Sequence, residues 1–219
     1  MPDATRYPIP AAETRTEIRV VNSRFIATAA YTPTVDDAKV FIARMRVEFA
    51  DATHNVFAYV VGYGATTTLG MSDDGEPAGT AGRPTLAVLR GSGLGDVAVV
   101  VTRYFGGTLL GTGGLVRAYG DAVRAVLEEL PRSEKVERRA LLVAISYSQY
   151  EQVRRLIAAH NGTITGDEFA ADITLTLLFA VDDVSAFTDE LRDLTAGQAE
   201  LIDLGGAADV AADDPGAGG

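Results

Sequence analysis

The sequence predicts an α+β protein of two domains. A β-branched run at 96–104 indicates a strand covered on both faces, and a long helical pattern that stops at Pro131 follows it. After Pro131 the pattern becomes strand, helix, strand, strand, helix, strand, which is the order of a ferredoxin-like βαββαβ sandwich. A length of 219 residues is sufficient for two such domains.

The first domain is expected to span residues 16–131. Alternation of apolar and polar residues predicts its first strands, and an apolar face predicts a helix that starts at Asp36 or Asp37. Residues 1–15 are predicted to be disordered, and Leu69–Arg83, rich in Gly, Asp and Pro, is predicted to be a loop. The predicted strands are 16–21, 25–31, 57–63 and 96–104, and the predicted helices are 36–49, 85–89 and 115–130.

The second domain is expected to span residues 135–204, after a joint at 131–134. The same two periodicities predict its strands and helices. The tail 205–219 is mostly Ala, Gly and Asp, and it is predicted to be disordered because it has little apolar area to bury. The predicted strands are 136–147, 163–169, 173–181 and 200–204, and the predicted helices are 149–160 and 184–194.

Composition narrows the class of protein. Hydrophobic residues make up 47% of the chain and charged residues 22%, as in proteins with a packed core. Cysteine is absent and only two histidines occur, which excludes disulfides, thiolate sites and multi-histidine metal centres. We expect no metal and no cofactor. The sequence shows neither a signal segment nor an apolar run of about eighteen residues. We therefore expect a cytoplasmic protein without membrane contact. The sequence does not define the oligomeric state.

Charge is distributed unevenly along the chain. Residues 1–131 carry 12 Lys and Arg against 14 Asp and Glu, whereas residues 132–219 carry 7 against 16. A surface that binds a polyanion is therefore expected in the first domain. The excess of acidic residues in the second domain is open to three explanations: a salt-adapted source, GC-rich coding, or a binding partner.

A glycine-rich connection that leads directly into a helix is the main candidate for a binding site. Backbone N–H groups at a helix N-terminus, with the positive end of the helix dipole, bind anions without a charged side chain. Arg103 at the end of the buried strand and Arg117 in the first predicted helical turn could add bidentate phosphate contacts. Alternatively, the glycines only permit close packing of strand and helix. They are Gly106, Gly107, Gly111, Gly113 and Gly114.

Carboxylates come shortly before this connection. Asp73, Asp74 and Glu76 are expected to form an acidic lip across the cleft from the two arginines. They could serve as acid/base groups, or the aspartates could bond the backbone of their own turn. A lone histidine, His54, could be an acid/base group or a phosphate contact, although such a residue is more often structural. The candidate set is completed by Thr80 and Arg83.

These segments together resemble the IMPACT/YigZ family. They occur in order and cover the first domain nearly throughout, and the second domain is similar to the family's C-terminal module in element order and position. The chain departs from the family at Val56, where relatives often carry Cys, so no chemistry can depend on that thiol. The matching segments are Ser23–Ala27, Thr53–Tyr59, Ser72–Pro77, Gly79–Pro84, Val99–Gly107 and Gly111–Tyr119.

The resemblance implies a ribosomal-protein-S5-domain-2-like fold for the first domain. It also implies a likeness of the pair to domains IV and V of elongation factor G, which contact RNA on the ribosome. The residues before Thr16 leave no room for the extra N-terminal domain with which eukaryotic relatives affect a starvation kinase, so the chain resembles the bacterial and archaeal branch.

Three functions follow as alternatives. The first is a protein that binds RNA or the ribosome, or a protein partner of the translation machinery, and so influences translation. The second is an enzyme that acts on a phosphorylated small molecule. The third is a non-catalytic interaction module whose acidic second domain docks a basic partner. We expect the first.

Overall fold

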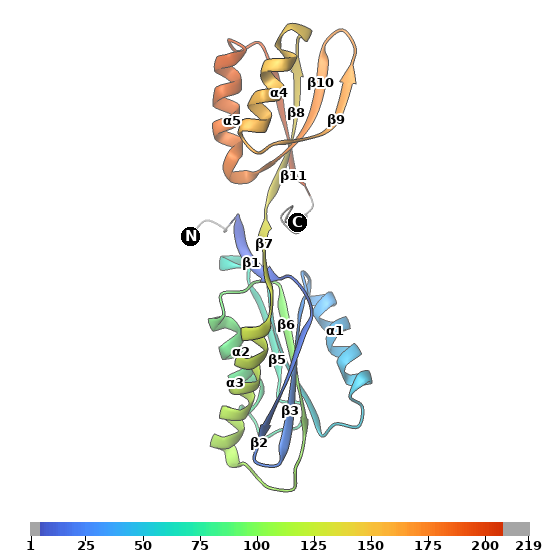
Figure 1. Cartoon of the computed structure of the whole chain (residues 1–219), viewed down its shortest axis with the longest axis vertical. Coiled ribbons are helices and arrows are strands. Elements are labelled where there is room, and N and C mark those ends of the chain that lie inside the picture. Colours follow the sequence, from blue (N-terminus) through green and yellow to red (C-terminus); the bar gives the residue numbers. More distant parts are fainter. Residues whose placement is uncertain (1–4, 208–219) are drawn as a thin grey trace, which may run out of the picture. The chain divides into compact units, whose positions relative to one another are not determined.

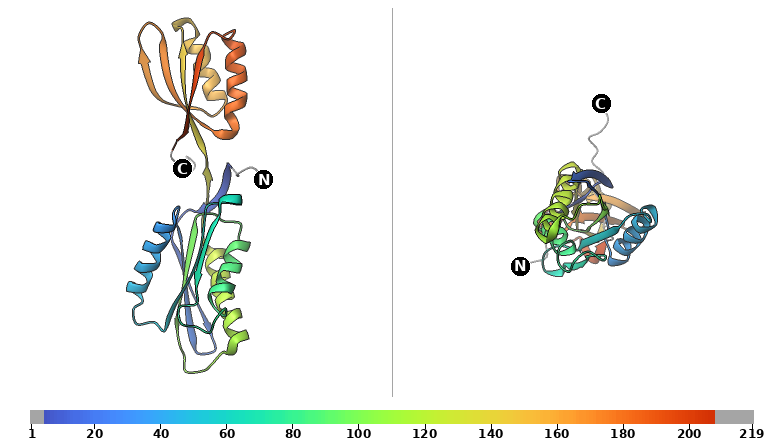
Figure 2. Two further views of the ribbon diagram at one scale, coloured as in Figure 1. Left: turned by 180° about the vertical axis from the view of Figure 1, so that it is seen from behind. Right: turned by 90° about the horizontal axis from the view of Figure 1, so that it is seen from below.

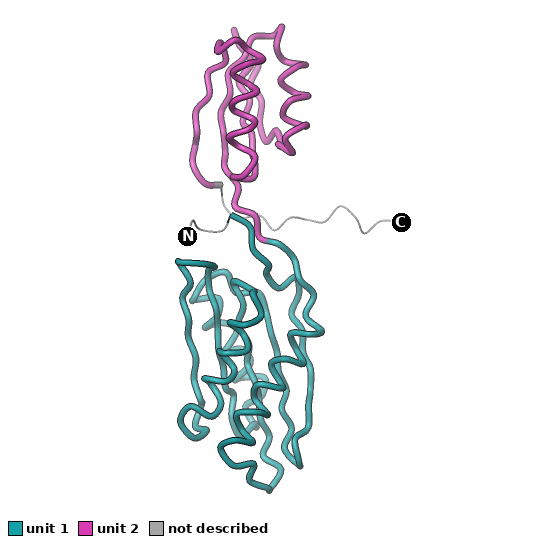
Figure 3. Tube along the Cα trace, turned by 90° about the vertical axis from the view of Figure 1, so that its left-hand side faces the viewer, with its two compact units in different colours: residues 1–134 teal, residues 135–219 magenta. Residues whose placement is uncertain are grey.

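The protein is described from a computed structural model, in which residues 5–207 are placed. The chain divides into two compact units, residues 1–134 (unit 1) and residues 135–219 (unit 2), which Figure 3 shows in two colours. Each unit has its own sheet, helices and hydrophobic core. The predicted α+β class is confirmed. Among the placed residues, no helix has the length and apolar character needed to cross a membrane.

Unit 1 is a five-stranded sheet with helices on both faces. The strands lie in the order β2-β3-β6-β4-β5, and each neighbouring pair is antiparallel. Helix α1 covers one face, while α2 and α3 cover the other (Figures 1 and 2). The strands are β2 (Thr14–Val20), β3 (Ser23–Tyr31), β4 (His54–Val61), β5 (Thr68–Ser72) and β6 (Val97–Tyr104), and the helices are α1 (Val35–Glu48), α2 (Gly82–Gly91) and α3 (Gly111–Glu129).

The central strand β6 is buried on both faces, as its β-branched sequence predicts. Val99 and Val101 pack with α2 and α3, whereas Ala98 and Val100 pack with α1. Side chains that alternate along a strand point to opposite faces, so each layer of helices has its own core. The end of β6 carries Arg103 into the layer that holds α2 and α3.

Helix α1 has the predicted apolar face, but its cap differs from the prediction. Thr34, rather than Asp36 or Asp37, is the N-cap, and its Oγ1 accepts a hydrogen bond from the N–H of Asp37 at 3.1 Å. The two aspartates lie in the first helical turn, where negative charge is favourable.

Strand β5 corrects the prediction that Leu69–Arg83 is entirely a loop. Thr68–Ser72 pairs with β4 at the edge of the sheet, and Leu69 and Met71 remain exposed there. An exposed edge strand needs no apolar alternation, so it left no periodic signal. Gly70 is required because a Cβ at this position would lie 2.2 Å from the Tyr59 ring. A single-turn helix, η1 (Gly64–Thr66), precedes β5.

The N-terminal segment corrects a second prediction, because much of residues 1–15 is ordered. Strand β1 (Arg6–Pro10) pairs with β7 (Arg132–Val136). The Tyr7 ring stacks on Tyr63 with centroids 4.9 Å apart, and its hydroxyl donates to Asp96 Oδ2 at 2.9 Å. These tertiary contacts order the segment, although its sequence has no apolar periodicity.

Unit 2 has the predicted ferredoxin-like βαββαβ order. Its antiparallel sheet has the strand order β11-β8-β10-β9, and α4 and α5 pack on one face. Phe179 and Phe187 form the centre of the core, with ring centroids 4.3 Å apart. The elements are β8 (Arg138–Ile145), η2 (Tyr147–Gln149), α4 (Tyr150–Ala159), β9 (Thr163–Phe169), β10 (Ile173–Ala180), α5 (Val181–Leu194) and β11 (Glu200–Ala207).

Two boundaries in this part of the chain differ from the prediction. The segment expected as one strand over 136–147 contains the end of β7 and then β8. Strand β11 continues to Ala207, past the predicted start of the disordered tail, because residues 205–207 still pair with β8. The remainder of the predicted tail, 208–219, lies outside the described residues.

Candidate functional site

A cavity of about 400 Å³ in unit 1 lies where the start of β4 and the end of β6 meet the start of α3. Its ionisable lining residues are His54, Glu76 and Arg103, and apolar side chains form most of its wall. The remaining lining residues are Thr53, Gly75, Pro77, Phe105, Leu109, Leu110, Gly111, Thr112 and Leu115. Four predicted site residues, His54, Glu76, Arg103 and Gly111, therefore border one space.

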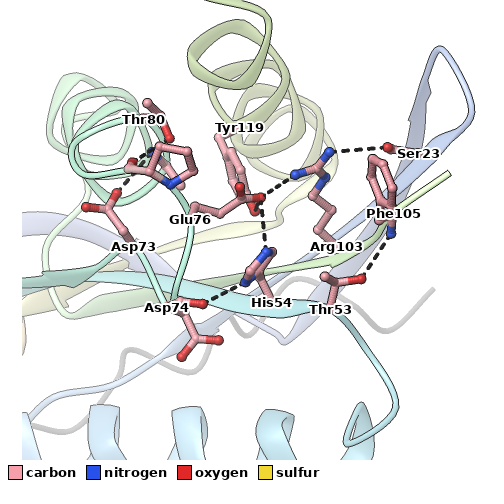
Figure 4. Close-up of polar contacts among 12 residues, drawn as sticks. Ser23, Thr53, His54, Asp73, Asp74, Glu76, Thr80, Arg103, Phe105 and Tyr119 are labelled. Atoms are coloured by element: carbon pink, nitrogen blue, oxygen red, sulfur yellow. Dashed lines mark hydrogen bonds and ion pairs between the residues drawn. The ribbon is translucent and has the colours of Figure 1, made fainter. Parts of the chain in front are cut away.

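Arg103 is buried, with 5% of its surface exposed. Its Nη1 donates to Glu76 Oε1 at 2.6 Å, and its Nη2 donates to Ser23 Oγ at 3.4 Å. The guanidinium carbon lies 5.5 Å from the ring centroids of both Phe25 and Phe105. Arg103 is thus held from several sides by unit 1 itself. Figure 4 shows this network.

Glu76 joins the end of β6 to helix α3. Its Oε1 also accepts a hydrogen bond from the Tyr119 hydroxyl at 2.8 Å. Burial raises the pKa of Tyr119 above its ordinary value, and the negative charge of Glu76 raises it further. Tyr119 therefore remains protonated and donates to the carboxylate, which is shared between a cation and a hydroxyl.

His54 begins β4 and borders the cavity. Its Nδ1 lies 2.7 Å from the backbone oxygen of Asp74, and its Nε2 lies 3.9 Å from Glu76 Oε1. A carbonyl oxygen can only accept, so we assign the proton to Nδ1. In the neutral ring Nε2 is then the free acceptor on the side of Glu76 (Figure 4).

The carboxylate of Asp73 binds backbone N–H groups at the start of α2. It accepts hydrogen bonds from the N–H groups of Gly79 at 2.8 Å, Ala81 at 3.1 Å and Gly82 at 2.7 Å. Burial alone would raise the pKa of Asp73, but these three backbone donors lower it below its ordinary value. The carboxylate also explains why α2 begins at Gly82, three residues before the predicted start.

Asp74 is likewise engaged in holding the turn. Its Oδ2 accepts from the N–H of Asn55 and its Oδ1 from Arg46 Nη2, each at 2.7 Å. Thus Asp73 and Asp74 do not border the cavity, and the three carboxylates do not form the single acidic lip that was predicted. Only Glu76 faces this space.

The glycines divide into two groups. A Cβ at Gly106 would lie 2.0 Å from backbone atoms of Asn22, so this glycine permits close packing. Gly111, Gly113 and Gly114 are not in a connection, as predicted, but form the first turn of α3. Helix α3 therefore starts four residues earlier than predicted. Gly107, which has φ of 83°, lies in the connection.

The early start of α3 changes the position of Arg117. It lies in the second turn rather than the first, two residues after Leu115, which corresponds to about 200° around the helix axis. Leu115 borders the cavity and Arg117 is exposed outside its lining. Arg83 is also exposed, while Thr80 is buried and donates to the Pro77 carbonyl at 2.7 Å.

Residue-level reasoning missed several members of this site. Tyr119 was visible only as an aromatic residue in a helical pattern, and Ser23 only as part of a segment that resembles the family. Phe105 and Leu109, which are 45% and 86% exposed, lie in the connection itself. Within residues 5–207, no group of three or more His, Asp or Glu side chains is arranged to hold a metal ion.

Comparison with known proteins matches both units. Residues 21–127 match the Impact N-terminal domain, and residues 143–198 match a domain of unknown function, DUF1949. The chain is 40% identical over 195 residues to the IMPACT family member YigZ of Escherichia coli, a match that covers 89% of this chain and 96% of that protein. The chain belongs to the IMPACT family. The resemblance seen in its motifs is confirmed.

Other members of the IMPACT family are also similar along most of their length. The member YvyE of Bacillus subtilis is 32% identical over 185 residues, which cover 84% of this chain and 85% of that protein. A crystal structure described as that of a hypothetical protein is 38% identical and covers 91% of this chain and 97% of that chain, with a TM-score of 0.65. The α+β fold with an S5-domain-2-like first unit and a ferredoxin-like second unit agrees with these matches.

Proposed function

We propose that this member of the IMPACT family is an RNA- or ribosome-associated protein that influences translation, and that it contacts RNA through the cavity of unit 1 and the exposed arginines of α2 and α3. The observation that carries the proposal is the first turn of α3, which opens on the cavity beside His54 and Arg103. Its backbone N–H groups and its positive dipole end attract phosphate.

The charge of the two units supports the assignment to unit 1. Residues 1–134 carry 13 Lys and Arg against 15 Asp and Glu, whereas residues 135–219 carry 6 against 15. On the sheet face of unit 2 opposite its helices, the alternating positions of β8 and β10 hold Arg138, Ala140, Leu142, Ala144, Thr174, Thr176, Leu178 and Ala180. These two strands, all of whose residues are placed, have no aromatic side chain there on which a base could stack.

The experiment is a salt titration of binding to a short single-stranded RNA. Removal of one arginine that binds a phosphate should reduce the slope of log K against log salt by about 0.7. We expect a lower slope for Arg117→Gln and Arg83→Gln, because both are exposed arginines of α3 and α2, the helices on the same sheet face as the cavity. Arg155→Gln, an exposed arginine of α4 in unit 2, is the matched control and should bind like the parent.

Two results would contradict the proposal. One is a parent protein that retains neither RNA nor ribosomal fractions at about 50 mM salt. The other is an unchanged slope in both variants of unit 1 together with a reduced slope in Arg155→Gln, which would move the RNA-binding surface to unit 2.

A further inference from the structure

The cavity of unit 1 has two chemically different regions, an apolar wall and the start of a helix. We propose that it binds a single nucleoside monophosphate group, with the phosphate at the N-terminus of α3 and the base against the wall formed by Phe105 and Leu109. This inference rests on the proposed function and specifies the ligand of the same site.

The phosphate region is the first turn of α3. Gly111 and Thr112 border the cavity, and the N-cap residue, Leu110, supplies no side-chain hydrogen bond to this turn. In the described chain, the first turn contains no acidic residue. The free N–H groups, the helix dipole and the Thr112 hydroxyl are all suited to phosphate oxygens.

A second observation, independent of the helix, also points to a ligand. Arg103 borders the cavity and is 5% exposed, and its Nε is buried without a hydrogen-bond partner among residues 5–207. A buried donor without a partner is costly in a folded protein and is often explained by a missing ligand or water. Two of the five N–H donors of Arg103 are used by Glu76 and Ser23, and Nε is its nitrogen without any partner.

The carboxylate of Glu76 does not oppose an anion at the α3 end. Arg103 lies 2.6 Å from its Oε1 and the Tyr119 hydroxyl lies 2.8 Å from the same atom, so its charge is balanced locally. Both of these hydrogen bonds end on Oε1, which leaves Oε2 outside them. Together with His54 Nε2, this oxygen offers acceptors to the polar edge of a base.

The size and wall of the cavity suit a base better than a phosphate alone. A volume of about 400 Å³ lies in the range of small-ligand pockets, and these are also mostly apolar with a few polar groups. Phe105 is 45% exposed and Leu109 is 86% exposed, although both are large apolar side chains. Stacking on an aromatic ring is the usual way in which proteins hold a base without reading its sequence.

Thr112→Glu gives a test in which binding and stability move in different directions. A carboxylate in the first turn of α3 is favourable for the helix, but it occupies the phosphate position and repels the ligand. We expect a melting temperature equal to or above that of the parent, and nucleotide affinity reduced at least about tenfold. Phe105→Ala should lower affinity by about ten- to a hundredfold through loss of stacking.

The matched control is Val40→Glu. It makes the same change of charge at a side chain that is 69% exposed on α1, across the sheet from the cavity. The probes are the four nucleoside 5′-monophosphates, inorganic phosphate and uridine, measured by calorimetry. We expect saturable binding of monophosphates to the parent and to Val40→Glu, and affinities at least about tenfold lower for phosphate or uridine alone.

Two further probes distinguish an RNA end from a free nucleotide as the source of the nucleoside monophosphate group. A short RNA with a 5′-phosphate that binds more tightly than both its 5′-hydroxyl form and the free monophosphate assigns the site to an RNA end. Equal or tighter binding of the free monophosphate assigns it to a free nucleotide. The inference is overturned if no monophosphate or 5′-phosphorylated RNA binds, or if Thr112→Glu binds them like the parent.

The two proposals can fail separately. Monophosphate binding that is unchanged in Thr112→Glu, together with RNA retention that weakens in Arg117→Gln, overturns the nucleotide pocket and leaves RNA association standing. A parent that binds monophosphates but retains neither RNA nor ribosomal fractions overturns RNA association and leaves the pocket standing.

Discussion

In unit 1 the ion pair between Arg103 and Glu76 is buried, whereas in unit 2 the ion pair between Arg139 and Asp203 is exposed. The side chains of the first pair are 6% and 3% exposed, and those of the second are 39% and 42% exposed. A buried charge depends on its partner, because the protein interior cannot replace water around it. The buried pair therefore imposes a constraint at the cavity of unit 1 that the exposed pair of Arg139 and Asp203 does not impose, and the cavity is where we place the ligand.

The largest effect in this comparison is expected from Arg103→Ala. It leaves the Glu76 carboxylate buried without its cation, which should lower the free energy of unfolding by about 3–5 kcal/mol. Urea denaturation measures the change. Arg139→Ala is the control and should cost about 1 kcal/mol or less; equal losses in both variants would remove the contrast between the units.

A smaller effect is expected from Tyr119→Phe. The variant removes only the hydroxyl that donates to Glu76 at 2.8 Å, and a hydrogen bond to a charged group contributes about 1.5–3 kcal/mol. Denaturation should show this loss without a change in the urea dependence of the transition. Tyr147→Phe in unit 2 removes an exposed hydroxyl bonded to the Ala170 carbonyl and should change stability less. A Tyr119→Phe protein as stable as the parent would show that Arg103 alone satisfies Glu76.

Asp73→Asn is expected to lower the free energy of unfolding by an amount that depends on pH. The pKa of Asp73 is lowered in the folded state, so its contribution is present above its unfolded pKa and is lost as pH falls through the folded value. At neutral pH we expect the parent to exceed Asp73→Asn by about 1 kcal/mol, the usual scale of a helix cap. The difference should shrink below about pH 4.

The control for this titration is Asp121→Asn, which changes an exposed aspartate paired with Arg124. Its effect should stay within about 0.5 kcal/mol at neutral pH. An Asp73→Asn difference that does not depend on pH would mean that the ionised carboxylate is not what holds the start of α2.

The smallest effect concerns salt and the acidity of unit 2. If self-repulsion among its surface carboxylates matters, KCl should stabilise unit 2 more than unit 1, by about 1 kcal/mol or less. Hydrogen exchange of β10 and β6 amides reports the two units separately. Stability of unit 2 that is flat or falls with KCl would assign its acidity to coding or to a binding partner.

Elements with a strong local signal are predictable from the sequence. The β-branched run of β6 predicts burial on both faces, and the order of elements after Pro131 predicts the βαββαβ unit, because periodicity reflects which face meets the core. The sequence also placed His54, Glu76, Arg103 and Gly111 in a candidate site. These residues do border one cavity.

Which of the candidate residues share that cavity depends on tertiary contacts. Asp73 is bonded by backbone N–H groups six to nine residues away and Asp74 by the N–H of Asn55, and Arg117 lies on a different face of α3 from Leu115. Edge strands such as β5 and β1 form because a neighbouring strand offers free hydrogen-bonding groups, and their own residues carry little periodic signal. The direction and partner of a side chain depend on contacts between distant segments, and local periodicity contains no information about them.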